Sequence, residues 1–147
     1  MSTLNKAIEI AARAHAGRIG EDGEAEILHP LRVMLRLHSD DERQAAMLHD
    51  VIEDCGMTAA ELLAAGFTED VVAAVEVLTG RADETYEQYI NRVIQLPLAA
   101  RVKRADVEEH TSVVRRQPVS DQQLLRLDNY QRARVKLSAA LAQGLIP

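Results

Sequence analysis

The stretch AAMLHDVIEDC, residues 45–55, carries one histidine and three carboxylates within an apolar run and contains no lysine or arginine. At roughly 100° of rotation per residue, an α-helix places His49, Asp50, Glu53 and Asp54 on one side and the neighbouring apolar residues on the other. Carboxylates that face the interior repel one another unless they bind protons or share a cation. The stretch therefore predicts an amphipathic helix with either raised carboxyl pKa values or a bound divalent metal ion.

Helix signals continue along the rest of the chain. Apolar periodicity and start signals predict helices within residues 4–16, 29–38, 41–55, 67–80 and 97–116, and a last helix that runs to about residue 144. A Ser or Thr followed three residues later by Glu or Gln indicates further helix starts at Thr58, Thr85 and Ser120. No run of alternating β-branched residues indicates a strand. We predict an all-α fold, with residues 1–147 forming a single compact domain of about eight helices.

Composition and charge restrict the kind of partner that the chain can have. Aromatic residues make up only 3% of the 147 residues, so the core must be built from Ala, Leu, Val and Ile, which suits helices. The net charge of −6 argues against nucleic-acid binding, although a bound metal ion can still attract a small phosphorylated ligand. The sequence contains neither a signal peptide nor an apolar run of about 18 residues. We therefore expect a cytoplasmic protein with no membrane partner.

A metal ion at the 45–55 stretch needs more ligands than one adjacent His-Asp pair. His29 precedes Pro30 at a predicted helix start, and Asp106 lies in the middle of a predicted helix with apolar neighbours. Together with His49 and Asp50, they offer two neutral nitrogens and two anionic oxygens, which balance the charge of a divalent ion. Four protein ligands leave two positions of an octahedral ion for water and substrate. The alternative interpretation of His49, Asp50 and Asp106 is a solvated helix surface, and that of His29 is a helix cap.

Four motifs occur in a fixed order: HP at residues 29–30, LHDVIED at 48–54, LTG at 78–80 and VKRAD at 102–106. In this order they resemble the HD-domain hydrolases of the RelA/SpoT type, and more narrowly the small stand-alone alarmone hydrolases. The resemblance is strongest over about residues 11–112. Those enzymes have a helical HD domain and remove the 3′-pyrophosphate of guanosine tetra- and pentaphosphate. The resemblance therefore implies a metal-dependent phosphohydrolase with a small phosphorylated nucleotide as its substrate.

The resemblance also implies a role for particular residues. The metal ligands of the family, which usually hold Mn²⁺ and here could hold Fe²⁺, correspond to His29, His49, Asp50 and Asp106. The paired acidic residues that follow the His-Asp pair correspond to Glu53 and Asp54, which we expect to orient the attacking water and transfer protons. The metal would polarise a phosphoryl oxygen and lower the pKa of the water.

The sequence departs from the family pattern where the substrate should bind. The family has an Arg-Lys pair before the first ligand, whereas this chain has Gly20 and Glu21. Arg18 lies two positions away and is a candidate replacement, and Lys103 could offset phosphate charge. Four residues after Asp106 the family usually has Asn, whereas this chain has His110, a further candidate substrate contact. Two alternatives stay open: an HD hydrolase with another phosphoester substrate, and a catalytically silent module that binds metal or nucleotide.

Overall fold

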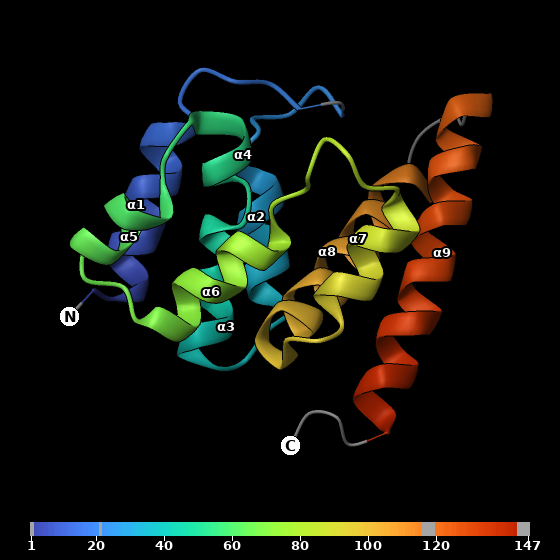
Figure 1. Cartoon of the computed structure of the whole chain (residues 1–147). Helices are drawn as coiled ribbons and strands as arrows, with labels where there is room; N and C mark the ends of the chain where they lie inside the picture. The colour runs from blue at the N-terminus through green and yellow to red at the C-terminus, as the bar shows by residue number, and fades with distance from the viewer. Residues whose placement is uncertain (1, 21, 116–119, 144–147) are drawn as a thin grey trace.

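Helices form the regular structure of the residues that the computed structural model describes, which are 2–20, 22–115 and 120–143 (Figure 1). Within these ranges the helices are α1 (Leu4–Ala14), α2 (Leu28–Leu35), α3 (Asp40–Leu48), α4 (Val51–Cys55), α5 (Ala59–Ala64), α6 (Glu69–Leu78), α7 (Tyr86–Val93), α8 (Pro97–Arg115) and α9 (Asp121–Ala142). Over the same ranges the β-type pairing is one isolated bridge between Ile19 and Ala25. The all-α prediction is confirmed.

The expected continuous helix over residues 41–55 is interrupted, so that the described part of the chain has nine helices where about eight were expected. Helix α3 ends at Leu48 and α4 begins at Val51. The Nδ1–H of His49 donates a hydrogen bond to the carbonyl oxygen of Ala46, a group that accepts from the amide of residue 50 in an uninterrupted helix. Asp50, with φ −99° and ψ −3°, then departs from ideal helical geometry.

Side chains that accept from free backbone amides mark the helix starts. The side chain of Thr85 accepts from the amide of Gln88, and the Gln88 side chain accepts from the amide of Thr85, so α7 has the expected capping box. Thr58 accepts from the amide of Glu61 at the start of α5. Ser120 directly precedes α9. The sequence signals therefore located all three starts.

Helix α3 connects the two parts of the core. It packs against α1 and α2 on one part of its surface and against α6 and α8 on another, while α9 packs along α8 (Figure 1). The side chains of Met47, Leu48, Val102 and Val107 are fully buried. Because α2, the end of α3 and the middle of α8 are neighbours in this core, polar residues on them can meet.

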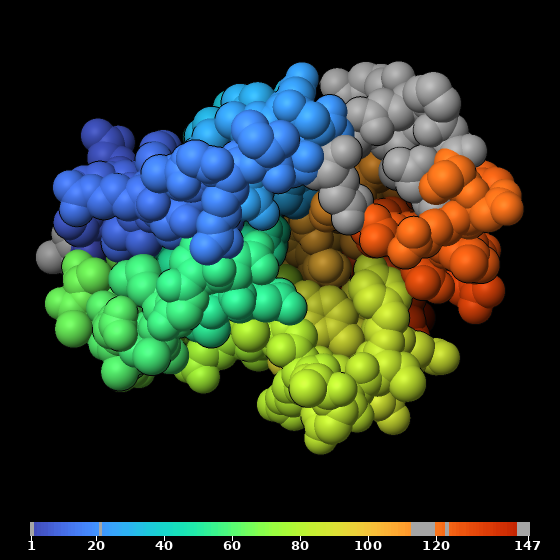
Figure 2. All heavy atoms as spheres, turned by 90° about the horizontal axis from the view of Figure 1, so that it is seen from above, coloured from blue at the N-terminus to red at the C-terminus, as the bar shows by residue number. Residues whose placement is uncertain are grey.

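Viewed from above, the molecular surface is hollowed between the blue N-terminal segments, the green segment that includes α4 and the orange α9 (Figure 2). Amber atoms of α8 are visible in the depth of this hollow (Figure 2). None of the helices that the structure describes combines the length and the apolar character needed to cross a membrane.

Candidate metal centre and acidic pair

Three imidazoles surround one carboxylate oxygen of Asp106. The Nε2 atom of His29 lies 2.7 Å from Asp106 Oδ1, that of His110 lies 3.4 Å away and that of His49 lies 3.5 Å away. The other carboxylate oxygen, Oδ2, accepts a hydrogen bond of 2.8 Å from Lys103 Nζ. Helix α2 supplies His29, the C-terminal end of α3 supplies His49, and α8 supplies the rest. Side chains from three separate parts of the chain therefore converge on one point.

Two overlapping groups of ligand atoms in the described chain have the spacing of a metal site, since in each the atoms lie within 4.8 Å of one another. The first group is His29, His49 and Asp50, and the second is His29, Asp106 and His110. Opposite ligands of an octahedral ion lie about 4 Å apart, because each bond is roughly 2.1 Å long. The donors of both groups can therefore hold a metal ion, and all four expected ligands belong to one group or the other.

The tautomer of His49 suits a metal ligand. Its Nδ1 carries a hydrogen, because the Ala46 carbonyl that it meets can only accept. Its Nε2 lies 3.1 Å from Asp50 Oδ2 and 3.5 Å from Asp106 Oδ1, so it faces two anionic acceptors. Either a proton or a metal cation must lie between these atoms. A histidine that binds a metal usually donates its other ring N–H to a carbonyl or carboxylate, as His49 does here, and metal uptake at Nε2 would release any proton held there.

Neighbouring positive charges keep the aspartates of this cluster anionic in spite of their burial. Burial alone would raise the pKa of Asp106, but Lys103 and His110 hold it well below its usual range. Burial likewise raises the pKa of Asp50, yet the adjacent His49 outweighs it and lowers that pKa to about 2. Burial lowers the pKa of His49, whereas Asp50 and Asp106 raise it well above its usual range. The site thus places permanent negative charge where a divalent ion would bind.

Glu53 and Asp54 lie one turn further along, on the exposed side of α4. Partial burial raises the pKa of the Glu53 carboxyl, and the negative charges of Asp54 and Asp50 raise it further. Partial burial and the charge of Asp50 raise the pKa of Asp54 in the same direction. Neither residue belongs to a ligand group of the described chain. Carboxyls with raised pKa values beside a metal site are suited to accept and donate protons.

Arg18 reaches the acidic pair from the loop between α1 and α2. Its Nη1 donates a hydrogen bond of 2.9 Å to the backbone carbonyl of Asp54. The loop is folded back on itself by backbone hydrogen bonds from Glu26 to Arg18 and from Gly20 to Glu24. Glu21 lies outside the described residues. The structure therefore places the candidate replacement cation beside the expected proton-transfer groups.

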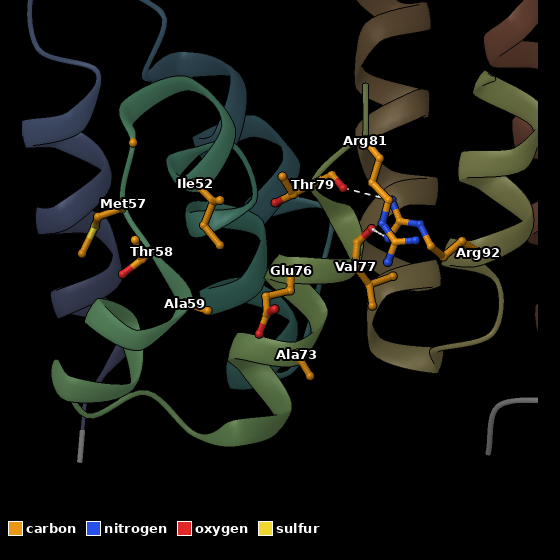
Figure 3. Close-up of a pocket in the computed structure, with 12 residues that line it drawn as sticks. Ile52, Met57, Thr58, Ala59, Ala73, Glu76, Val77, Thr79, Arg81 and Arg92 are labelled. Atoms are coloured by element: carbon orange, nitrogen blue, oxygen red, sulfur yellow. Dashed lines mark hydrogen bonds between the residues drawn. The ribbon is translucent and has the colours of Figure 1, made fainter. Parts of the chain in front are cut away.

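A pocket of about 750 Å³ adjoins α4 and the residues that follow it, Gly56 and Met57 (Figure 3). It lies between the start of α5, α6 and the loop that follows α6, and Ile52 and Gly80 are among its lining residues. A Cβ atom at Gly80 would lie 3.6 Å from Glu53 Oε1, so the Glu53 carboxyl is close to the pocket edge. Arg92 closes part of the wall, because its guanidinium donates to the carbonyl oxygens of Val77 and Thr79 (Figure 3). None of the clustered histidines or aspartates lines this pocket.

Two tyrosines, Tyr130 and Tyr89, support the cluster from neighbouring helices. The Tyr130 ring of α9 stacks on the His110 ring, with centroids 5.1 Å apart and an angle of 18° between the planes. The Tyr89 ring lies 5.1 Å from Lys103 Nζ, and its hydroxyl donates a hydrogen bond of 2.6 Å to the Leu78 carbonyl. These contacts depend on helix packing, which no local sequence pattern shows.

No family model matches the chain. The chain is 39% identical, over 66 residues, to a guanosine-3′,5′-bis(diphosphate) 3′-pyrophosphohydrolase of Vibrio cholerae, and this match covers 42% of the chain. It is 32% identical, over 119 residues and 72% of the chain, to a probable GTP pyrophosphokinase of Mycobacterium leprae. A solved structure, described as a metazoan ortholog of SpoT that hydrolyses ppGpp, covers 99% of the chain with a TM-score of 0.71 and 19% identity. The resemblance to RelA/SpoT-type HD-domain hydrolases is confirmed.

The RelA/SpoT-type relatives differ greatly from this chain in length. The chain spans 9% of the Vibrio cholerae protein and 15% of the Mycobacterium leprae protein. The metazoan structure is of similar size, since the match covers 98% of that chain as well, and at 19% identity this likeness shows a shared fold. The chain therefore matches a small part of each longer relative and nearly the whole of the metazoan structure.

Proposed function

We propose that this chain is a metal-dependent phosphohydrolase that removes the 3′-pyrophosphate of guanosine tetra- or pentaphosphate. The observation that carries the proposal is the convergence of two ligand groups beside an acidic pair with raised pKa values. The activity named for the Vibrio cholerae relative is the same reaction. Hydrolysis would use one water and yield guanosine di- or triphosphate and pyrophosphate.

His29, His49, Asp50 and Asp106 are the residues that we propose as ligands of Mn²⁺ or Fe²⁺. Two imidazoles and two carboxylates form a borderline-hard set that suits either ion and balances its charge. When bound, a divalent ion would polarise a phosphoryl oxygen and lower the pKa of water.

The side chains around this ligand set have separate proposed tasks. Glu53 and Asp54 orient the attacking water, take up its proton and return a proton to the leaving oxygen. Raised pKa values suit carboxyls that both accept and donate protons. Lys103 is buried against Asp106, so we assign it to holding that ligand in place, where the sequence suggested a direct phosphate contact. We propose that Arg18, which donates a hydrogen bond to the Asp54 carbonyl, contacts substrate phosphate.

A second candidate is a hydrolase of the same type that acts on a different phosphorylated nucleotide. The substrate loop favours it, because Gly20 stands where the family has a cation and the loop acids Asp22 and Glu24 pair with Arg32. A loop with fewer free cations attracts a tetra- or pentaphosphate less strongly. The acidic pair argues against a silent binding module, which has no need of proton-transfer groups.

A nucleotide panel incubated with the chain and Mn²⁺ tests the proposal. We expect pyrophosphate release from guanosine tetraphosphate, together with guanosine diphosphate as the second product. Turnover of another nucleotide in its place would favour the second candidate. A chain that binds the metal and hydrolyses none of the panel would contradict an enzymatic role.

A further inference from the structure

We propose that His110 is an additional protein ligand of the metal ion, so that the centre holds three imidazoles and two carboxylates. This inference rests on the metal site of the proposed function. It assigns His110 to the metal and not to the substrate, and it makes the site richer in nitrogen than the two-histidine set.

The position of the His110 ring carries the inference. Its Nε2 lies 3.4 Å from Oδ1 of Asp106, a residue one helical turn earlier in α8. The centroid of the His110 ring lies 4.3 Å from that of the His29 ring. His29, Asp106 and His110 already form one of the two ligand groups. Both groups contain His29, so one ion that draws on both is the simplest occupancy. Under this arrangement His110 occupies a position that four protein ligands would leave open.

His110 could instead be only a charge partner of Asp106, but this role explains the contacts around Asp106 less well than a metal-ligand role does. Asp106 already receives Lys103 Nζ on one oxygen at 2.8 Å and His29 Nε2 on the other at 2.7 Å. The contact of His110 Nε2 with Oδ1, at 3.4 Å, is longer than either of these two. Three imidazole nitrogens within 3.5 Å of one carboxylate oxygen can instead share a metal ion that this oxygen also binds.

Helix α9 holds the His110 ring in this direction. The Tyr130 ring stacks on its outer face at 5.1 Å and 18°, while the His29 ring lies against it on the way to the cluster. The His110 side chain is 40% exposed, so its ring can adjust to an ion without disturbing the core. The packing of α8 against α9 thus contributes to the metal site, although no residue of α9 belongs to a ligand group of the described chain.

A third imidazole changes which metal the site prefers. Imidazole suits Fe²⁺, Co²⁺ and Zn²⁺, whereas carboxylate and water suit Mn²⁺, and affinities of such sites rise from Mn²⁺ through Fe²⁺ to Co²⁺. The family residue at this position, Asn, offers only a neutral amide oxygen. The substitution of that Asn by His110 therefore favours Fe²⁺ and Co²⁺ over Mn²⁺.

Metal titration of His110→Asn, with no substrate present, tests this inference. Co²⁺ serves as the probe, because its visible absorption reports the number and type of its ligands, and Mn²⁺ is titrated in parallel. We expect the variant to bind Co²⁺ at least about tenfold more weakly than the parent chain, with a changed absorption spectrum and a smaller loss for Mn²⁺. His38→Asn, an exposed histidine outside both ligand groups, is the matched control and should match the parent chain.

A second measurement needs no variant. In the Co²⁺ form, each ligating imidazole gives one strongly shifted N–H proton signal that exchanges with solvent, so we expect three such signals from the parent chain. The role of His110 would be overturned by only two such signals from the parent chain. It would also be overturned if His110→Asn had the Co²⁺ affinity and spectrum of the parent chain. Either result would leave the proposed function standing. A parent chain that takes up neither ion would overturn the metal centre itself.

Discussion

Lys103 Nζ lies 2.8 Å from Asp106 Oδ2 across one turn of α8, and the Lys103 side chain is 13% exposed while that of Asp106 is 4% exposed. This ion pair occupies one carboxylate oxygen and leaves Oδ1 to face the three histidines. Burial lowers the pKa of Lys103, but Asp106, Tyr89 and Tyr86 raise it well above its usual range, so the ammonium stays charged. The pair therefore fixes both the orientation and the charge of a proposed ligand.

Replacing Lys103 by Met should weaken metal binding. Without the ammonium the pKa of Asp106 rises, since Lys103 is the main cause of its low value. We expect a loss of about 10- to 100-fold in Mn²⁺ affinity, as is typical when a partner of a metal ligand is removed. The loss should grow as the pH falls, because protons then compete for Asp106. Chelator competition at several pH values measures this, with Lys136→Met on α9 as the control; equal affinities for the two variants would contradict the role of Lys103.

Glu53→Gln should abolish most of the turnover while the metal stays bound. General acid–base groups contribute about 10²- to 10⁴-fold to rate, so we expect kcat to fall by that factor. Glu69→Gln, which changes an exposed carboxylate at the start of α6, is the matched control. Turnover in Glu53→Gln equal to that in the control would exclude Glu53 from proton transfer.

The same substitution should not destabilise the fold. The folded-state pKa of Glu53 is raised, so its ionisation costs folding stability as the pH rises through that pKa. Glutamine removes this cost, and we expect a melting temperature at pH 7 equal to or above that of the parent chain. Thermal unfolding followed by circular dichroism checks this, and a clearly lower melting temperature would show that Glu53 has a structural role.

Glu42 should show the opposite pH dependence. It accepts from the amides of His38 and Ser39, which together with Arg101 lower its pKa although burial acts to raise it. A lowered folded-state pKa gives stability that is present above the unfolded pKa of about 4.3 and is lost as the pH falls through the folded value. We expect Glu42→Gln to cost about 1 kcal/mol or less at pH 7. Urea unfolding at pH 7 and near pH 3 should show this difference shrink at the lower pH.

Metal binding should stabilise the chain against heat. A ligand that binds only the folded state adds about 2.7 kcal/mol when its concentration is one hundred times its Kd, which raises the melting temperature by several degrees. We expect this shift with Mn²⁺, its reversal by a chelator, and its loss in Asp106→Asn. A melting temperature that does not respond to any divalent ion would argue against the metal centre.

The sequence carried enough information for the helices and for the proposed ligand set, but not for the support around it. Capping patterns at Thr58 and Thr85 are local, and the order of the four motifs linked His29 and Asp106 to the His49–Asp50 pair. No glycine or proline marks the break between α3 and α4 in the sequence. The break depends instead on the hydrogen bond from the His49 ring to the Ala46 carbonyl, which a helix pattern does not show. The stacking of Tyr130 on His110 depends on how α9 packs against α8, which no short pattern shows.

The most direct test of the account is anomalous diffraction from a crystal of the chain soaked with Mn²⁺. We expect one strong manganese peak within bonding distance of His29, His49, Asp50 and Asp106, with Glu53 and Asp54 nearby but unbound. An empty cluster at saturating Mn²⁺, with the four side chains arranged as they are here, would contradict the proposed metal-dependent hydrolase.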